Sequence, residues 1–304
     1  MNIKSKAMMA AAAGATLLAG ALSAQAADIK IGPDQTPLTV APSSAAAAML
    51  PAAFKSAIKI ATDPSAPPYT YYAADGKTLI GADIDMGNAI AAKLGVKADW
   101  SAIKFPGIIA AIQANRFDMA LTSMGDTPAR EKQLDFVDYS TDGNAIVVAK
   151  GNTLGIKTIA DLCGKRVAVL QGSVTQGLVE QQNAKCDKKI DIQAFQDNNQ
   201  ALLQVRTGRA DATMYQYGVA AYIIKTSPEG EGLEVLTFQT YGTGYNAIPF
   251  RKSDSGLRDA VQAALKDMQA DGTYKAILSA WGMEAGGLAN ITVNDGLRFN
   301  QPSN

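Results

Sequence analysis

Histidine is absent from the 304 residues of this sequence, in which 28 lysines and arginines balance 28 aspartates and glutamates. Without histidine, the chain cannot supply a serine–histidine–aspartate triad, a histidine general base or a histidine-ligated zinc ion. The balanced charge argues against nucleic acid or an anionic membrane surface as the main partner. What remains for binding or catalysis is arginine, carboxylates, hydroxyl groups and aromatic rings, although aromatic residues make up only 7% of the chain.

Other absences narrow the possible ligands further. The sequence contains neither the P-loop spacing G-x-x-x-x-G-K-[ST] nor the G-x-G-x-x-G spacing, so a nucleotide site is unsupported. Its two cysteines, Cys163 and Cys186, are too few for a metal site without histidine. They form either free buried thiols or a disulfide, and we favour a structural disulfide, worth on the order of 3 kcal/mol in an oxidising compartment. No metal and no cofactor are expected.

The first 26 residues have the features of a secretory signal peptide. Lys4 and Lys6 precede an unbroken run of small apolar residues from Met8 to Leu22, and Ala24-Gln25-Ala26 is an A-x-A cleavage site. The alternative, a transmembrane anchor, is disfavoured because a span needs about 20 apolar residues. We expect cleavage before Ala27 and export of the mature chain to the periplasm as a soluble monomer.

Strands and helices are expected to alternate along most of the remaining chain. The expected strands are 58–61, 97–100, 117–122, 166–170, 190–195, 210–215 and 246–250, and the expected helices are 85–94, one starting at 106, 175–182, 200–207, 219–225, 255–270 and 274–281. This alternation predicts an α/β fold with mostly parallel sheets in two lobes. Residues 27–56, which are rich in alanine, proline and serine, are predicted to form a mobile leader, and residues 286–304 a polar tail.

Three segments at predicted strand ends carry the polar groups from which a site can be built. They are Asp63–Tyr69 followed by Gly81–Asp85, then Thr122–Arg130, and finally Gln171–Thr175. In the second segment, hydroxyls and backbone N–H groups near a helix start, together with Arg130, can hold both oxygens of a carboxylate. Ligands of open α/β folds lie outside the carboxyl ends of the strands, so two facing lobes would enclose a small molecule.

At these residues the sequence resembles the polar-amino-acid substrate-binding proteins of ABC importers, solute-binding protein family 3. The resemblance covers residues 58–283 and depends on motifs in a fixed order: D-P-S-x-P-P-aromatic, G-x-D-x-D, F-D…T-P-x-R, D-L-x-G-K-x-V-x-V-x-x-G-(S/T), G-R-x-D and A-D-G-T-Y…W-G. It implies a two-lobed periplasmic-binding-protein fold, the Venus flytrap, in which two mixed, mostly parallel sheets are joined by hinge strands near 142–148 and 241–247. Lobe 1 would comprise 57–144 and 245–285, and lobe 2 would comprise 145–244.

The resemblance also implies the ligand contacts and the partner. Arg130 would bind the carboxylate of an amino acid or a derivative, and an ABC permease in the inner membrane would receive the ligand. The other contacts would be Gly125, Thr122, Ser123, Asp63, Tyr69, Phe105, Leu170, Val174, Thr175, Tyr215 and Gln216. Taken alone, the residues leave alternatives open: Asp63 capping the turn at Pro64, Tyr215 packing inside lobe 2, and Gln216 pointing into that lobe.

Two positions depart from the family pattern. Gln216 stands where members usually have an acidic residue that holds the α-ammonium group, and Ala66 stands where they commonly have a tyrosine or phenylalanine. Glutamine presents a dipole instead of a charge, and it can also donate a hydrogen bond. Together the two departures favour a carboxylate whose amine is modified, hidden or absent, such as an opine, a betaine-like acid or a heteroaromatic acid.

The leading hypothesis is a binding module without catalysis that delivers its ligand to a permease. An enzyme on the same fold, similar to periplasmic cyclic-carboxylate dehydratases, is the alternative, with Asp63, Asp126 or a lysine as the available acid or base. The sensor ectodomain of a receptor is a third possibility, disfavoured because no membrane span follows residue 283.

Overall fold

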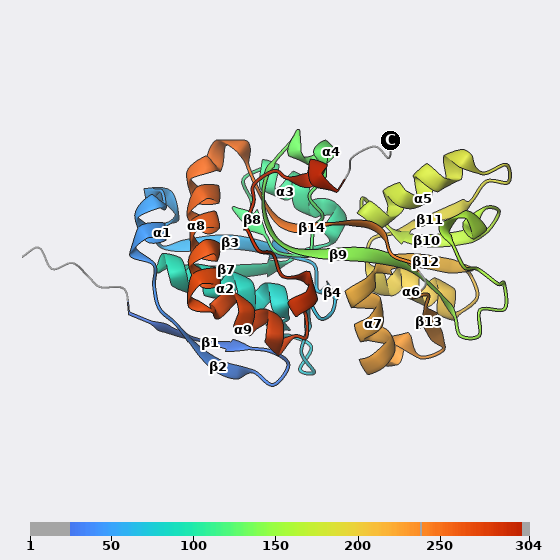
Figure 1. Cartoon of the computed structure of the whole chain (residues 1–304), viewed down its shortest axis with the longest axis horizontal. Coiled ribbons are helices and arrows are strands. Elements are labelled where there is room, and N and C mark those ends of the chain that lie inside the picture. Colours follow the sequence, from blue (N-terminus) through green and yellow to red (C-terminus); the bar gives the residue numbers. More distant parts are fainter. Residues whose placement is uncertain (1–24, 238, 300–304) are drawn as a thin grey trace, which may run out of the picture.

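Residues 25–237 and 239–299 are described by the computed structural model, which divides them between two lobes (Figure 1). Most of the predicted signal peptide, residues 1–24, lies outside the described residues. Among the helices of the described part, none combines the length and the apolar character that crossing a membrane requires. The two-lobed α/β fold predicted from the sequence is confirmed by the arrangement of the strands and helices described below.

Lobe 1 is built on short parallel strands whose side chains alternate between two packed faces. Strand β3 (Ala57–Thr62) pairs in parallel with β7 (Lys97–Ala102) and with β8 (Met119–Ala120). Ile58 and Ile60 on one face pack with α2 (Ala82–Leu94), α8 (Ser255–Asp271) and α9 (Thr273–Ala280). Ala61 on the other face packs with α3 (Ile108–Gln113). Beside this sheet, β4 (Ser65–Ala66), β5 (Thr70–Tyr72) and β6 (Leu79–Ile80) pair in antiparallel order.

Lobe 2 repeats the same design with a different set of elements. Its central strand β10 (Arg166–Leu170) pairs in parallel with β11 (Asp191–Phe195) and β12 (Ala212–Gln216). Helix α5 (Val174–Lys185) packs on one face of this sheet, and α6 (Asn198–Arg206) and α7 (Tyr217–Thr226) pack on the other. Alternation in β10 explains the two cores, because Val167 and Val169 are buried toward α5 and Ala168 toward α6 and α7.

Two long antiparallel strands connect the lobes. They are β9 (Asp135–Ala149) and β14 (Tyr241–Phe250), which pass from one lobe to the other in Figure 1. Because β9 pairs with β12 and β14 pairs with β8, strands of both lobes form one continuous sheet in the order β11-β10-β12-β9-β14-β8-β3-β7. A short strand, β13 (Leu233–Val235), adds to β9. The connecting strands β9 and β14 include the segments 142–148 and 241–247, where the resemblance placed the hinges.

The segment predicted to be a mobile leader is instead part of lobe 1. Strands β1 (Ala27–Ile31) and β2 (Thr36–Val40) form a hairpin, and α1 (Ser44–Met49) packs against α8. The apolar side chains of Ile31, Val40 and Leu50 are buried in the lobe 1 core. The hairpin is also tied down by Asp85, which accepts hydrogen bonds from the Gly32 N–H (2.8 Å) and from the Trp281 indole (2.7 Å). Composition alone suggested mobility, but these few apolar residues are enough to anchor the segment.

The polar tail that follows α9 also packs on lobe 1. Residues 287–299 run across the lobe from α9 toward α4 (Pro128–Glu131), as the red segment of Figure 1 shows. Val293 and Gly287 form isolated bridges with β9, and the side chain of Asn294 accepts a hydrogen bond from the Phe136 N–H at 2.7 Å. At its end, the Gly296 N–H donates to the Glu131 carboxylate of α4 at 2.9 Å.

The disulfide predicted from the sequence is present in lobe 2. Cys163 and Cys186, 23 positions apart with Cα atoms 5.4 Å from each other, join the segment before β10 to the end of α5. Cys186 is buried in the core on the α5 face. The bond therefore closes a loop that contains both β10 and α5.

We expect the double variant Cys163→Ser with Cys186→Ser to lose about 3 kcal/mol of unfolding free energy, because the open loop gives the unfolded chain more conformational freedom. Urea unfolding of both proteins, with and without reductant, measures this loss. Reductant should lower the stability of the wild type toward that of the variant and leave the variant unchanged. A wild type that is insensitive to reductant while fully reduced would contradict the expectation.

Candidate functional site

A cavity of about 610 Å³ lies between the two lobes and is lined by residues from both and from the hinge strands. All the predicted contact residues except Tyr69 line it. Tyr69 is buried behind the wall, where its hydroxyl donates to Asp142 at 3.1 Å and accepts from Asn246 at 3.2 Å. The structure therefore brings the three predicted segments together at one place, and the ligand contacts of the individual residues stay predictions.

Arg130 is held in the cavity by the start of a very short helix. Thr127 caps α4 by accepting a hydrogen bond from the Arg130 N–H at 3.3 Å, and Pro128 occupies the first turn. The guanidinium donates to the Gly125 carbonyl at 2.6 Å and, from the other side of the cavity, to the Gly172 carbonyl at 2.8 Å. The Cζ atom of the guanidinium lies 5.7 Å from the centre of the Phe105 ring.

Among the described residues, no carboxylate contacts the charged group of Arg130. The residue is only 8% exposed, and among the described residues no aspartate or glutamate lies within ion-pair distance. Burial lowers the pKa of Arg130 to about 10, which leaves the group positively charged at neutral pH. A buried guanidinium surrounded by neutral carbonyls and N–H groups is suited to bind an anion, above all a carboxylate that takes both arms of the fork.

The start of helix α5 adds further donors from lobe 2. Ser173 caps this helix, accepting from the Gln176 N–H at 3.1 Å, and its hydroxyl lies 2.8 Å from that of Thr175. Gly172, at φ +73°, adopts a left-handed conformation that places its carbonyl toward Arg130. Because the first residues of α5 line the cavity, the positive end of the α5 dipole faces it from lobe 2.

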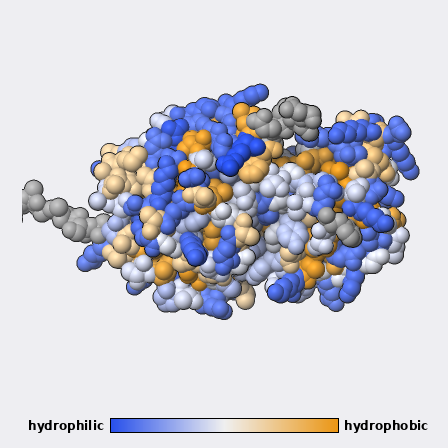
Figure 2. Space-filling view, viewed as in Figure 1, coloured by the Kyte–Doolittle hydropathy of each residue, from blue (hydrophilic) through white to orange (hydrophobic). Residues whose placement is uncertain are grey.

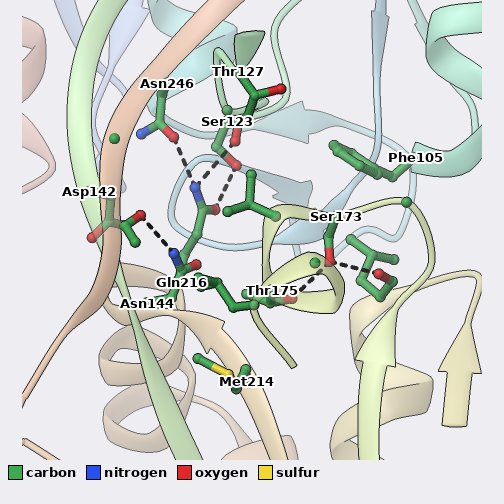
Figure 3. A pocket seen from close by; sticks show the side chains of 18 of the residues that line it. Phe105, Ser123, Thr127, Asp142, Asn144, Ser173, Thr175, Met214, Gln216 and Asn246 are labelled. Carbon is green, nitrogen blue, oxygen red and sulfur yellow. Dashed lines mark hydrogen bonds between the residues drawn. The ribbon is translucent and has the colours of Figure 1, made fainter. Parts of the chain in front are cut away.

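Gln216 connects both lobes and a hinge strand. Its amide oxygen accepts from the Ser123 hydroxyl at 2.9 Å, and its amide nitrogen donates to the Ser123 carbonyl at 3.2 Å and to Asn246 at 2.9 Å (Figure 3). Both of its N–H groups are thus used within the protein. The side chain points into the cavity, so the alternative in which it points into lobe 2 is wrong.

Asp63 lines the cavity, with one carboxylate oxygen hydrogen-bonded and the other buried. Its Oδ2 atom accepts from the Phe105 N–H at 2.7 Å, whereas Oδ1 is buried and has no hydrogen-bond partner among the described residues. Burial raises the pKa of Asp63, and the Phe105 N–H opposes that rise. Close by, Lys104 forms an ion pair with Asp197 of lobe 2 at 2.7 Å.

Comparison with known proteins identifies the family. A model of bacterial extracellular solute-binding proteins, family 3, matches residues 58–284. The chain belongs to this family. The histidine-binding periplasmic protein of Salmonella typhimurium is 31% identical over 79% of this chain and 92% of its own. The L-cystine-binding protein TcyA of Bacillus subtilis is 30% identical over 75% of this chain and 81% of its own.

Solved structures of similar proteins have the same two-lobed fold. An ancestral arginine-binding protein bound to arginine is 35% identical, with a TM-score of 0.68 over 74% of this chain and 97% of that one. An ancestral amino acid-binding protein described as a precursor of cyclohexadienyl dehydratase is 32% identical, with a TM-score of 0.67 over 75% of this chain and 96% of that one. The hairpin β1–β2, α1 and the C-terminal segment, residues 287–299, lie outside the range matched by the family model.

Sequence reasoning missed the hinge residues of this solute-binding protein. Asp142 and Asn144 on β9, and Asn246 on β14, line the cavity between the lobes. Asn144 donates to the carbonyls of Tyr241 and Gly242 at 3.0 and 3.2 Å, which ties the two hinge strands together. The signal that could have found them is a cluster of polar residues within the two strands expected to be hinges, where burial demands a reason for each polar side chain.

An acidic cluster lies directly behind Arg130. Asp126 is 3% exposed, and its two carboxyl oxygens accept no hydrogen bond from a donor of the described residues, whereas the protonated carboxyl hydrogen-bonds with its acidic neighbours Glu131 and Asp138. Burial raises its pKa to about 8, and the neighbouring charges of Asp138 and Glu131 act in the same direction. A neutral Asp126 leaves the charge of Arg130 available to a ligand. No group of described residues has the composition and spacing of a metal site.

We expect the free energy of unfolding to fall as the pH rises from about 4 to about 8. The folded protein keeps the proton of Asp126 up to its raised pKa, whereas the unfolded chain releases it near pH 4, so the folded state binds more protons in this window. Asp126→Asn removes this contribution and should flatten the pH dependence without abolishing it, because burial also raises the pKa of Asp83 and Asp138. Urea unfolding of the ligand-free proteins at pH 5 and pH 9 measures both slopes. The exposed Asp187→Asn is the matched control and should keep the wild-type slope; an equal slope in Asp126→Asn would contradict the assignment.

Proposed function

We propose that this chain is the periplasmic substrate-binding component of an ABC importer, and that it captures an amino acid or an amino-acid-like carboxylate between its two lobes. The observation that carries this proposal is Arg130, a buried guanidinium in the interlobe cavity with no carboxylate partner among the described residues. The curated relatives are named for binding histidine, cystine or arginine, which agrees with a ligand of this class.

The proposed working cycle is closure of the lobes on the ligand. In the structure, contacts between lobes 1 and 2 surround the cavity. They are Lys104 to Asp197 at 2.7 Å, Tyr71 to Tyr222 at 3.2 Å, and Arg130 to the Gly172 carbonyl at 2.8 Å. A ligand that touches α4 in lobe 1 and α5 in lobe 2 has a higher affinity for the closed arrangement, and therefore shifts the population toward it. The closed form would then deliver the ligand to a permease in the inner membrane.

The cavity supports a ligand with two different ends. Arg130 and the start of α5 are suited to a carboxylate, and the carboxylate of Asp63, which lines the same cavity, is the acceptor for a ligand group that donates hydrogen bonds. Ala66 lines the cavity in place of a larger ring, which leaves room beside Asp63. Modified amino acids and heteroaromatic acids therefore remain within the proposed range, together with plain polar amino acids.

The same proposal includes a periplasmic location and a monomeric state for the protein. Residues 1–26 would direct the chain to the periplasm and be removed before Ala27, the first residue of β1. The disulfide in lobe 2 suits an oxidising compartment. On the face drawn in Figure 2, hydrophilic residues surround small, separate apolar patches, which agrees with a monomer that meets its permease only transiently.

An enzyme on the same fold is the second candidate, and one observation favours it. One structural neighbour is described as the precursor of a dehydratase. Incubating the protein with each compound that it binds, followed by mass spectrometry, separates the two functions, since only an enzyme changes the mass of its ligand.

We expect Arg130→Ala to weaken binding on the order of a hundredfold or more, because a buried carboxylate would lose its charged, forked partner. Arg130→Lys should fall between this variant and the wild type, since it keeps the charge and loses the fork. Calorimetry with arginine, histidine, cystine and their derivatives measures the affinities. The matched control is Arg209→Ala, which removes an exposed arginine. An unchanged affinity in Arg130→Ala would refute the proposed carboxylate site.

A further inference from the structure

The C-terminal segment, residues 287–299, covers the side of α4 that faces away from the cavity. Gly296 is buried, and its N–H donates to the Glu131 carboxylate at 2.9 Å. A Cβ atom added to Gly296 would come 3.0 Å from the carboxyl group of Asp126 and 2.9 Å from Glu131, so the backbone of residue 296 lies directly against both acids. In Figure 1 the red end of the chain reaches α4. These residues lie outside the range matched by the family model, so the family match implies no role for them.

The end of the segment is fastened to the hinge strand β14 through Tyr245. The Tyr245 hydroxyl donates to Asp295 at 3.0 Å and accepts from Arg298 at 3.2 Å, and the Phe299 ring packs edge-on against the tyrosine ring at 4.8 Å. Tyr245 is in turn joined to Asp126, whose N–H donates to the Tyr245 carbonyl at 3.1 Å. Residues 295–299 therefore form a cover that is held in place over Asp126.

The carboxyl group of Asp126 has surroundings that disfavour its charge. Both oxygens are buried and accept no hydrogen bond from a donor of the described residues, and no described lysine or arginine lies within ion-pair distance. The titratable and charged groups on the elements packed around it are Arg130 and Glu131 of α4, Asp138 of β9, Tyr245 of β14, and Asp295 and Arg298 of the C-terminal segment. The Arg130 guanidinium donates to two carbonyls instead of to Asp126. Lack of water and acidic neighbours both favour the protonated form.

We infer that the C-terminal segment keeps Asp126 protonated by excluding water from it, and that the neutral Asp126 leaves the charge of Arg130 free for the carboxylate of a ligand. Both residues line the cavity, and the charge of Asp126 acts on the guanidinium. An ionised Asp126 attracts the guanidinium and repels a bound carboxylate, so both effects lower the affinity. Ligand affinity is therefore linked to pH through a residue that makes no ion pair in the structure. The inference rests on the proposed function and deepens it by naming what regulates the site.

The competing explanation is that the segment only stabilises lobe 1. Its first part does so, since Ile291 is buried in the core and the side chains of Thr292 and Asn294 form hydrogen bonds with β9. A chain that ends after Asn294 keeps these contacts and loses the cover. It also exchanges the Asp295 carboxylate for a new terminal one, so the main change at Asp126 is access to water. Structural damage weakens binding at every pH, whereas an ionised Asp126 weakens it only where the carboxyl group has lost its proton.

The first measurement is the titration of Asp126 in the ligand-free proteins by NMR of carbon-13-labelled carboxyl groups, with Asp126→Asn to assign the signal. We expect a pKa of about 8 in the wild type. In the chain that ends after Asn294 we expect the pKa to fall below about 7, because water stabilises the ionised form. The control is a chain that ends after Phe299. It keeps the cover and should titrate as the wild type does.

The second measurement is calorimetry from pH 5 to pH 9 with L-arginine and with 5-guanidinopentanoate as probes. A probe's own titration is the same for every protein, so the ratio of the variant's Kd to that of the wild type isolates the protein's contribution. We expect affinities within about threefold at pH 5, an approximately tenfold loss in the shortened chain at pH 7, and convergence at pH 9, where the wild type has ionised as well. Adding Asp126→Asn to the shortened chain should restore the affinity at pH 7, because asparagine carries no charge.

The other outcomes overturn the inference or the proposed function separately. A loss of affinity by the same factor at every pH, or one that Asp126→Asn does not rescue, would assign the cover a structural role only. An unchanged titration of Asp126 in the shortened chain would show that the cover does not hold the proton. If the wild type binds neither probe and none of the other carboxylates tested on Arg130, the proposed function fails, and the titration in the ligand-free proteins then decides whether the cover keeps Asp126 protonated.

Discussion

The burial of one guanidinium between two lobes is the constraint on which the rest of this site depends. A charge removed from water must be solvated by the protein, and Arg130 receives this solvation from the Gly125 carbonyl of its own lobe and the Gly172 carbonyl of the other. Asp126, which stays neutral up to about pH 8, lies behind the guanidinium and does not cancel its charge. Separation of the lobes would remove the Gly172 carbonyl from Arg130, so the solvation of this side chain depends on the position of lobe 2.

The two described segments outside the family match, the N-terminal one with β1, β2 and α1 and the C-terminal one at residues 287–299, both pack on lobe 1. The hairpin β1–β2 is bound to α2 through Asp85, and the C-terminal segment holds α4 through Glu131. Tyr245 adds to this support, because its hydroxyl donates to Asp295 at 3.0 Å and its ring packs against Phe299. The short helix that carries Arg130 would be marginal alone. The hydrogen bond from the C-terminal segment to Glu131 therefore helps to hold α4 in place on lobe 1.

The sequence predicts local elements well and long-range contacts poorly. Segments rich in apolar β-branched residues, such as Ile58–Ile60 and Arg166–Leu170, identify the buried strands, and the hydroxyls before Arg130 predict the candidate anion site, because both signals are local. The position of Tyr69 behind the wall, and the meeting of Asp142, Asn144 and Asn246, depend on the register of β9 with β12 and β14. The leader was misjudged for a related reason: a few apolar residues decide its packing, and their partners in α2, α8 and α9 lie far along the chain.

The order of the elements along the chain has a consequence for how the molecule is made. All of lobe 2, from β10 to β13, lies between the two hinge strands, whereas the core of lobe 1 requires α8 and α9, which come last. A chain that emerges from its amino end therefore completes lobe 2, with its disulfide, while lobe 1 still lacks a wall. Until Leu257 and Leu265 arrive, the hairpin β1–β2 and α1 cover only part of the apolar face of α2 and β3, so the incomplete lobe 1 is the part that needs protection from aggregation.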